Sequence, residues 1–136
     1  MSLGRKMSPE VAERYAADKE LAAGLRDRLA DAQEAEGRLR SGQAEHRPYD
    51  EVRLLAIGYE RALQTAILTA DAAERVAMGP KTYEHGDAGQ RRSAQIAARR
   101  ARAKPAVRPF TDEADRLRTL RETHKLTFHT SPSVAG

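Results

Sequence analysis

The side chains best suited to chemistry form one run of cations in the last third of the chain. Between residues 91 and 108 there are seven Lys or Arg residues and no Asp or Glu. Guanidinium forks match the oxygens of phosphate groups, and a helix that displays them can bind nucleic acid through counterion release. No aromatic residues are interleaved with these cations, so the run indicates contact with a phosphate backbone rather than with bases. The seven candidates are Arg91, Arg92, Arg99, Arg100, Arg102, Lys104 and Arg108.

Two other interpretations of this run remain open. Arginine-rich segments also contact acidic proteins, and a solvated basic helix needs no partner at all. The predicted helix from Arg91 to Ala103 contains one large apolar residue, Ile96, so the chain offers little to hold this helix on its own core. We therefore favour an exposed segment that contacts nucleic acid or an acidic protein.

Histidines show no metal-site pattern, because none has a second ligand residue three or four positions away on a firm predicted helix. The cluster around Glu84 and Asp87 is a polar loop, where residues of these types are expected without a metal. We predict no metal site and no cofactor. The four histidines are His46, His85, His124 and His129.

Carboxylates do not form an acid/base pair. Nearly every acid of the first predicted helix has a basic neighbour one turn away, as expected for a solvated charged face. Asp18 and Glu36 are exceptions because they fall on an apolar seam, where polar residues usually set register. The chain has no cysteine, no glycine-rich phosphate loop and no nucleophile elbow. The sequence therefore predicts no catalytic residue and a protein that is not an enzyme.

The elements that carry these residues are predicted to be helices. Alanine, the best helix former, supplies 25 of the 136 residues, and β-branched residues are scarce. A first helix begins at Ser8, keeps an apolar seam to Leu39 and ends at Ser41 and Gly42. A second helix runs from Pro48 until Gly79 stops it. Both have similar lengths and a short link joins them. We therefore predict an all-α fold with a long antiparallel helical hairpin over residues 8–78.

Three further segments complete the predicted organisation. Residues 1–7 form a flexible lead, residues 79–90 a polar loop, and residues 91–136 a basic C-terminal arm. The arm has 11 cations and 4 acids, whereas the chain before residue 91 has 13 cations and 16 acids. This difference indicates that the two parts face different partners.

The basic arm is predicted to contain two short helices and an extended C-terminal tail. The first helix spans residues 91–103 and ends before two prolines. The second begins with Thr111 as its N-cap and ends near Lys125. The tail covers residues 126–136.

The second helix of the hairpin carries more apolar side chains than its seam uses, and one facing helix cannot cover them all. Either a later segment folds back over them or another chain packs there. The later segments have few large apolar residues, so we predict self-association or docking on a larger assembly. The predicted packing interface comprises Leu54, Leu55, Ile57, Leu63, Ile67 and Leu68.

These features predict a structural or assembly protein, an adaptor or connector-like component of a larger complex such as a virus particle. The alternative is a sequence-nonspecific nucleic-acid-binding accessory protein that acts through residues 91–108. The longest uncharged helical stretch, Ala62 to Ala70, is far shorter than the roughly 20 residues of a membrane span. We expect no membrane partner and a cytoplasmic location, or one within an assembled particle.

Overall fold

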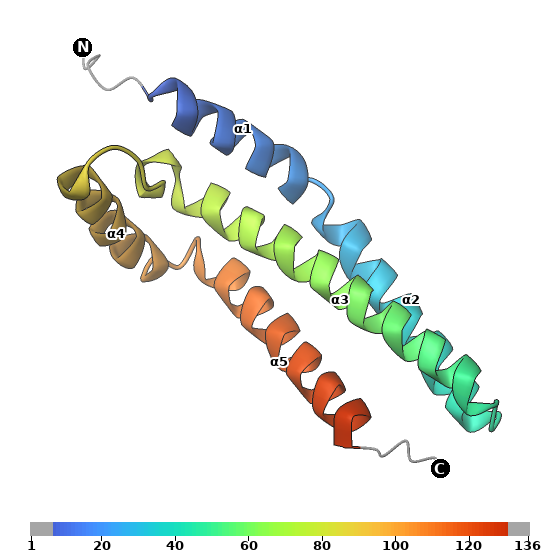
Figure 1. Cartoon of the computed structure of the whole chain (residues 1–136). Helices are drawn as coiled ribbons and strands as arrows, with labels where there is room; N and C mark the ends of the chain where they lie inside the picture. Colours follow the sequence, from blue (N-terminus) through green and yellow to red (C-terminus); the bar gives the residue numbers. More distant parts are fainter. Residues whose placement is uncertain (1–6, 131–136) are drawn as a thin grey trace.

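The computed structural model describes residues 7–130, and their regular secondary structure is entirely helical (Figure 1). The predicted all-α class is therefore confirmed. None of the described helices is long and apolar enough to cross a membrane. The helices in chain order are α1 (Pro9–Ala22), α2 (Leu25–Ala44), α3 (Tyr49–Met78), the short 3-10 helix η2 (Pro80–Thr82), α4 (Ala88–Arg102) and α5 (Arg108–Thr130).

The first predicted helix is divided into α1 and α2 at Gly24. Ser8 caps α1 as expected, because its side-chain oxygen accepts a hydrogen bond of 3.2 Å from the backbone N–H of Val11. Gly24 leaves the helical conformation, with φ −90° and ψ 6°. Glycine loses more conformational entropy in a helix than any other residue, so a break costs least here. Because the chain changes direction at this point, α1 and α2 pack along different parts of α3 (Figure 1).

Gly42 lies inside α2 instead of ending it. A Cβ atom at this position would lie 2.7 Å from Cδ1 of Leu55 on α3, so the glycine permits a close approach of the two helices. For this reason α2 continues to Ala44, past the predicted end at Ser41 and Gly42. The turn to α3 includes His46 with a positive φ of 54°. α3 then returns alongside α2 in the opposite direction (Figure 1).

α3 is the central helix of the described structure. It lies between the α1–α2 arm and α5, and it packs against all three of these helices (Figure 1). Its buried side chains include several alanines, which let the neighbouring helix backbones come close. The core consists of Ala56, Tyr59, Leu63, Ala66, Ile67 and Ala70 from α3, Ala32 and Leu39 from α2, and Ala114 and Leu117 from α5.

The expectation that the later segments are unsuited to cover α3 is wrong, because α5 folds back along it. α5 has few large apolar residues, but Leu117, Leu120 and Phe128 lie on one stripe that packs into the core. Polar anchors complete the docking. Arg118 pairs with Asp71 at 2.6 Å, and Nε2 of His124 donates a hydrogen bond of 2.8 Å to a backbone oxygen of α3. A narrow apolar stripe is therefore sufficient when charged and polar contacts flank it.

α5 extends beyond its predicted end near Lys125, and aromatic contacts stabilise the additional turn. The ring of His124 lies edge-on to Tyr59, with centroids 4.8 Å apart, and its centroid is 4.9 Å from that of Phe128. These contacts hold the last turns of α5 against α3, and the helix continues to Thr130. The first five residues of the predicted extended tail, 126–130, are therefore helical. Residues 131–136 and 1–6 lie outside the described part of the chain.

The helices of the basic arm also begin earlier than predicted. α4 starts at Ala88, so the predicted loop over residues 79–90 contains η2 and the first turn of α4. α5 starts at Arg108, three residues before the predicted cap at Thr111. Thr111 instead lies within the helix, where its hydroxyl donates a hydrogen bond of 2.5 Å to Glu74 of α3.

Replacing Leu117 with alanine tests whether α5 belongs to the core. Leu117 is 1% exposed, so Leu117→Ala should lower the free energy of unfolding by about 2 to 5 kcal/mol, because apolar burial is reduced and a cavity forms. Leu54→Ala is the matched control. Leu54 is 67% exposed, and its replacement should cost less than about 0.5 kcal/mol. Urea denaturation measures both values, and equal effects of the two substitutions would show that α5 is not docked.

Candidate functional site

The helix that carries most of the predicted cations, α4, is fixed at its start by a capping box. The Asp87 side chain accepts a hydrogen bond of 2.9 Å from the backbone N–H of Gln90, and the Gln90 side chain accepts one of 3.0 Å from the N–H of Asp87. Gly86 precedes this cap with φ 76°, a conformation that glycine adopts without strain. The sequence therefore contained a signal for the helix start, an acid followed three residues later by Gln, ahead of the predicted start at Arg91.

A stripe of alanines holds α4 against the rest of the molecule. Ala94 and Ala101 are buried, and Ala97 and Ala98 are half-buried. Ile96, the one large apolar residue of this helix, is instead 44% exposed. Because small side chains permit close packing, α4 docks on η2 and α3 without a large apolar face. The remaining faces of α4 are left to its charged residues.

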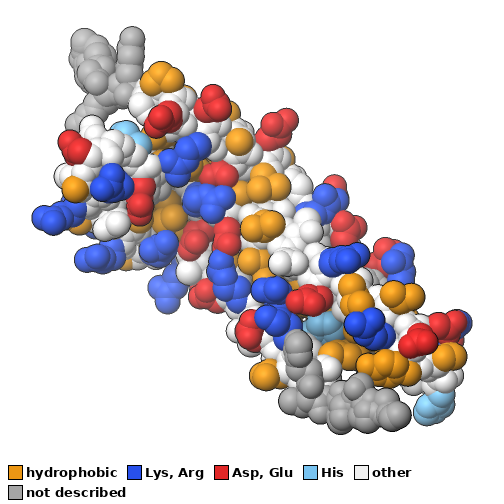
Figure 2. All heavy atoms as spheres, in the orientation of Figure 1, with side chains coloured by type: hydrophobic (Ala, Val, Ile, Leu, Met, Phe, Trp, Pro, Cys, Tyr) orange, Lys and Arg blue, Asp and Glu red, His pale blue; other side chains and the backbone are white. Residues whose placement is uncertain are grey.

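All seven predicted cations are exposed to solvent. Figure 2 shows Lys and Arg side chains gathered at the end of the molecule that α4 forms. Two of the seven have polar partners: Nη1 of Arg91 donates to the Gly86 oxygen at 2.8 Å, and Nε of Arg102 lies 3.8 Å from a Glu74 carboxylate oxygen. Within the described residues, no hydrogen bond or ion pair engages the side chains of Arg92, Arg99, Arg100, Lys104 and Arg108.

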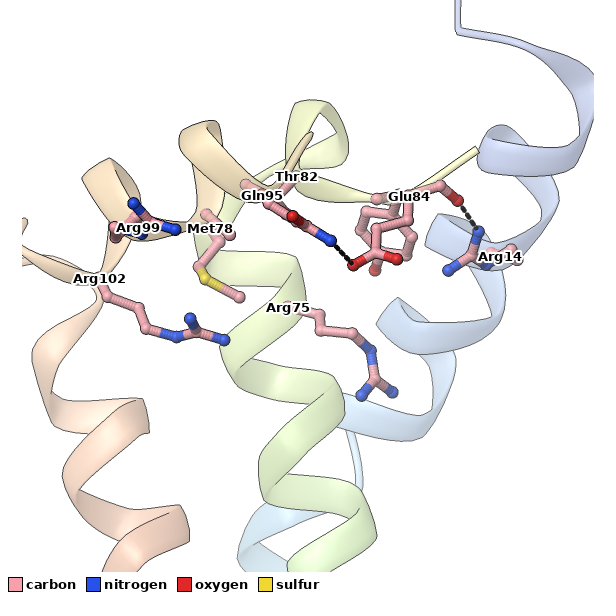
Figure 3. Close-up of a pocket in the computed structure, with 10 residues that line it drawn as sticks. Arg14, Arg75, Met78, Thr82, Glu84, Gln95, Arg99 and Arg102 are labelled. Atoms are coloured by element: carbon pink, nitrogen blue, oxygen red, sulfur yellow. Dashed lines mark hydrogen bonds between the residues drawn. The ribbon is translucent and has the colours of Figure 1, made fainter. Parts of the chain in front are cut away.

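A cavity of about 420 Å³ lies beside this cationic helix (Figure 3). Two of the predicted cations, Arg99 and Arg102, line it, and the other five do not. Two further arginines reach it from α1 and α3, and no local sequence pattern groups these two with α4. The lining residues are Arg14, Arg75, Met78, Thr82, Tyr83, Glu84, Gln95, Ala98, Arg99 and Arg102.

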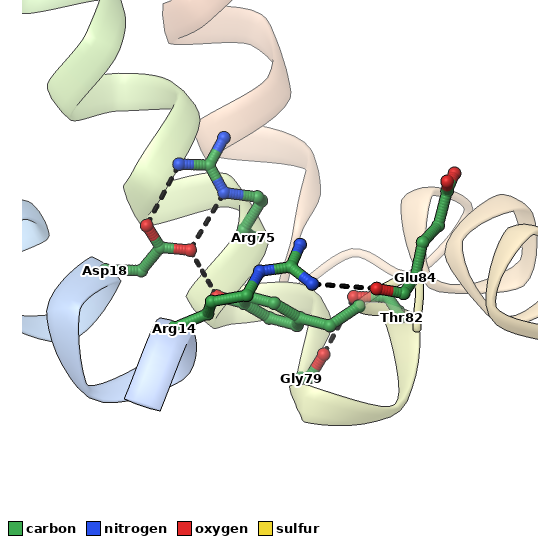
Figure 4. A network of polar contacts seen from close by, with 7 residues as sticks. Arg14, Asp18, Arg75, Gly79, Thr82 and Glu84 are labelled. Carbon is green, nitrogen blue, oxygen red and sulfur yellow. Dashed lines mark hydrogen bonds and ion pairs between the residues drawn. The ribbon is translucent and has the colours of Figure 1, made fainter. Parts of the chain in front are cut away.

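Asp18 connects α1 to α3 and to the loop after η2 (Figure 4). Its carboxylate accepts hydrogen bonds from Nε and Nη2 of Arg75 at 2.8 and 3.0 Å, and a third from the Tyr83 hydroxyl. The hydrogen bond from Arg75 holds the pKa of Asp18 below its usual value, although burial opposes this shift. The polar residue on the predicted seam is therefore an anchor between helices, a role that its position alone did not reveal.

The same network changes the proton affinity of the partners of Asp18. Burial is the main cause that raises the pKa of Tyr83, and the hydrogen bond to Asp18 adds to it. The hydrogen bond to Asp18 likewise raises the pKa of Arg75. At neutral pH the network is therefore an ion pair with a neutral phenol attached.

Arg14, one turn before Asp18 on α1, contacts the same loop. Its Nη1 atom donates a hydrogen bond of 2.7 Å to the backbone oxygen of Glu84, and its guanidinium carbon lies 5.2 Å from the centroid of the Tyr83 ring. Tyr15 packs edge-on against Tyr83 with centroids 5.9 Å apart. These contacts fix the loop that forms one wall of the cavity.

Glu36, the second polar residue on the predicted seam, also contacts α3. The Tyr59 hydroxyl donates to a Glu36 carboxylate oxygen at 3.4 Å, and Arg40 forms an ion pair with the same carboxylate at 3.0 Å. Burial raises the pKa of Tyr59, and the charge of Glu36 raises it further. Glu36 therefore helps to align α2 with α3.

The six residues of the predicted packing interface do not share one environment. Leu63 and Ile67 are buried inside this chain, and Leu55 and Ile57 are half-buried. Leu54 and Leu68 remain 67% and 60% exposed. A partner on this surface would therefore meet mainly Leu54, Leu68 and part of Ile57.

The histidines are dispersed in the described structure. His46 lies in the turn before α3, and His124 of α5 is buried against α3. Nδ1 of His85 lies 3.1 Å from the Tyr83 backbone oxygen. Among the side chains that the structure describes, no group of three or more His, Asp or Glu is arranged to hold a metal ion.

Removing the carboxylate of Asp18 should destabilise the fold in a pH-dependent way. Because Arg75 is 43% exposed, we expect Asp18→Asn to cost only about 1 to 2 kcal/mol at neutral pH, less than a fully buried pair. The folded-state pKa of Asp18 is lowered, so its contribution is present above the unfolded-state pKa and is lost as pH falls through the folded-state value.

Urea denaturation of wild type and Asp18→Asn between neutral and acid pH measures this difference. The two curves should converge at the lowest pH. Asp31→Asn is the control, because the ion pair of Asp31 with Arg28 is exposed and worth little. A gap between wild type and Asp18→Asn that stays constant across the pH range would contradict the assigned role.

Comparison of this chain with protein-family models, with curated proteins and with solved structures found no match. The function of the protein is therefore inferred from the side chains described above.

Proposed function

We propose that this protein binds nucleic acid through the phosphate backbone, using the cations of α4 and of the residues that link it to α5. The observation that supports this proposal best is the exposure of all seven cations in a segment without acids. No Asp or Glu occurs between Ala88 and Thr111, so these charges are not neutralised from within the segment. When cationic side chains bind phosphates, they release the counterions condensed on the nucleic acid, and most of these side chains have no partner among the described residues to give up.

The way α4 is held also supports this proposal. Its capping box and its buried alanines fix the helix before any ligand arrives. Less conformational entropy is then lost on binding than for a flexible basic tail. A helix of 15 residues is about 22 Å long at 1.5 Å per residue, which is enough to face several successive phosphates.

The expected binding is insensitive to base sequence. None of the side chains exposed on α4 is aromatic, so the surface of this helix has no platform for stacking bases. Arginine and lysine contacts to phosphates fix position but carry no sequence information. The proposed role is that of an accessory protein that coats or holds nucleic acid.

A structural or assembly role, as an adaptor or connector in a larger complex, is the second candidate. Leu54 and Leu68 favour it, because two large apolar side chains are exposed on the same helix with half-buried Ile57 between them. It ranks second because Leu63 and Ile67, which belonged to the surface that first suggested a partner, are buried in the core of this chain. The two roles are compatible, since one chain can hold both a partner and nucleic acid.

Charge removal on the outer side of α4 tests the first candidate. The triple substitution of Arg92, Arg100 and Lys104 by alanine should weaken binding to duplex DNA of arbitrary sequence. The salt dependence, expressed as the slope of log affinity against log salt, should become shallower by about one for each phosphate that the variant no longer neutralises. Alanine suits a helix, so α4 itself should persist.

The control removes the same charge elsewhere, by changing Arg26, Arg53 and Arg61 to alanine. All three are exposed and lie on α2 and α3. Fluorescence anisotropy over a range of salt concentrations measures both variants. If the control weakens binding as much as the α4 variant, net charge rather than α4 is responsible. Self-association in the assembly role should survive the α4 variant, which separates the two candidates.

A further inference from the structure

We propose that the cavity beside α4 binds the dianionic phosphate group of a phosphate monoester, with Arg99 and Arg102 as its ligands. This goes beyond the proposed function, because a terminal phosphate would be recognised in a cavity, whereas a nucleic-acid backbone would lie along the outer surface. The cavity cations are also different from Arg92, Arg100 and Lys104, the residues changed to test the outer surface.

The geometry of α4 places the proposed ligands together. Gln95, Arg99 and Arg102 follow steps of four and three residues, so they lie on one face of the helix. All three line the cavity. Two guanidinium groups one turn apart can offer paired N–H donors to the oxygens of one phosphate.

These two arginines are free to bind an anion. No polar partner engages the Arg99 side chain within the described residues. Arg102 has only an ion pair of 3.8 Å with Glu74, and that carboxylate already accepts a 2.5 Å hydrogen bond from Thr111. A phosphate would therefore displace little when it binds between them.

The other two arginines of the cavity are occupied. Arg75 makes two hydrogen bonds to Asp18, and Arg14 donates to the Glu84 backbone oxygen. Figure 3 shows Arg75 reaching toward α1 and Arg102 extending from the α4 side. The anion is therefore expected at the α4 end, while Asp18 and Glu84 hold the guanidinium groups at the α1 end.

The rest of the cavity explains why a monoester fits. A volume of about 420 Å³ lies within the range of small-molecule sites and exceeds what one phosphate needs. Met78 supplies an apolar wall for the organic group attached to the phosphate. The Glu84 carboxylate contacts the Gln95 amide at 3.4 Å and would repel a second anionic group. A ligand with one phosphate at one end matches this distribution of charge.

NMR titration of the whole protein with inorganic phosphate, at constant ionic strength maintained with chloride, tests the site. Saturable shifts are expected for the side-chain Nε–H signals of Arg99 and Arg102 and for the Gln95 amide. Two oligonucleotides of the same sequence, one with a 5′-phosphate and one with a 5′-hydroxyl, identify the source of the phosphate. Tighter binding of the phosphorylated strand indicates a strand end, whereas equal binding with saturable inorganic phosphate indicates a free monoester.

Glu84→Gln gives a test that unfolding cannot imitate, because it should improve binding. Removing this exposed charge is expected to tighten phosphate binding about fivefold, with Glu122→Gln on α5 as a silent control. Changing Arg99 and Arg102 to alanine should weaken phosphate binding by about tenfold or more. Changing Arg92 and Arg100, which do not line the cavity, should leave phosphate binding intact.

The inference is overturned if phosphate causes no shifts beyond those of chloride, or if neither Glu84→Gln nor the Arg99 and Arg102 variant alters its affinity. It stands independently of backbone binding. Loss of duplex binding in the outer-surface variant with intact phosphate binding supports both proposals. Phosphate binding in a protein that fails to bind duplex DNA supports the cavity site alone.

Discussion

The apolar face of α3 is wider than one neighbouring helix can cover, and this constraint determines the arrangement of the other helices. Leu63 and Ala66 are almost completely buried because the α1–α2 arm and α5 approach α3 from different sides. Neither the α1–α2 pair nor α5 has a strong apolar face of its own. Each is therefore held on α3 partly by polar contacts, such as those of Asp18 and His124. Burial of one helix thus fixes the positions of three others.

The position of α4 follows from the same constraint. α5 must return along α3, so the segment between them has to turn at the end of α3, where α4 forms (Figure 1). Little apolar surface is left there, and small residues such as Ala94 and Ala101 supply the contact. Because α4 needs few apolar residues for packing, arginines can occupy its solvent-exposed faces. The cationic surface and the cavity are both consequences of that placement.

Local signals predicted the helices and the cationic run well, because capping residues, helix formers and charge act over a few positions. Ser8 and Gly79 marked helix ends correctly. The return of α5 could not be predicted, because it depends on ion pairs and ring contacts between residues far apart in sequence, such as Arg118 with Asp71. The cavity was missed for the same reason, since its arginines come from α1, α3 and α4. The sequence identified Asp18 as a polar residue on the seam, but no local pattern identified Arg75 as its partner.

Hydrogen exchange of the whole protein, with and without duplex DNA of arbitrary sequence, tests most directly whether α4 is the nucleic-acid contact. The backbone amides of α4 and of the first turn of α5 should exchange more slowly when DNA is bound, whereas exchange in α2 should not change. Unchanged exchange over residues 88–108, or protection confined to α2 and the start of α3, would contradict this role of α4.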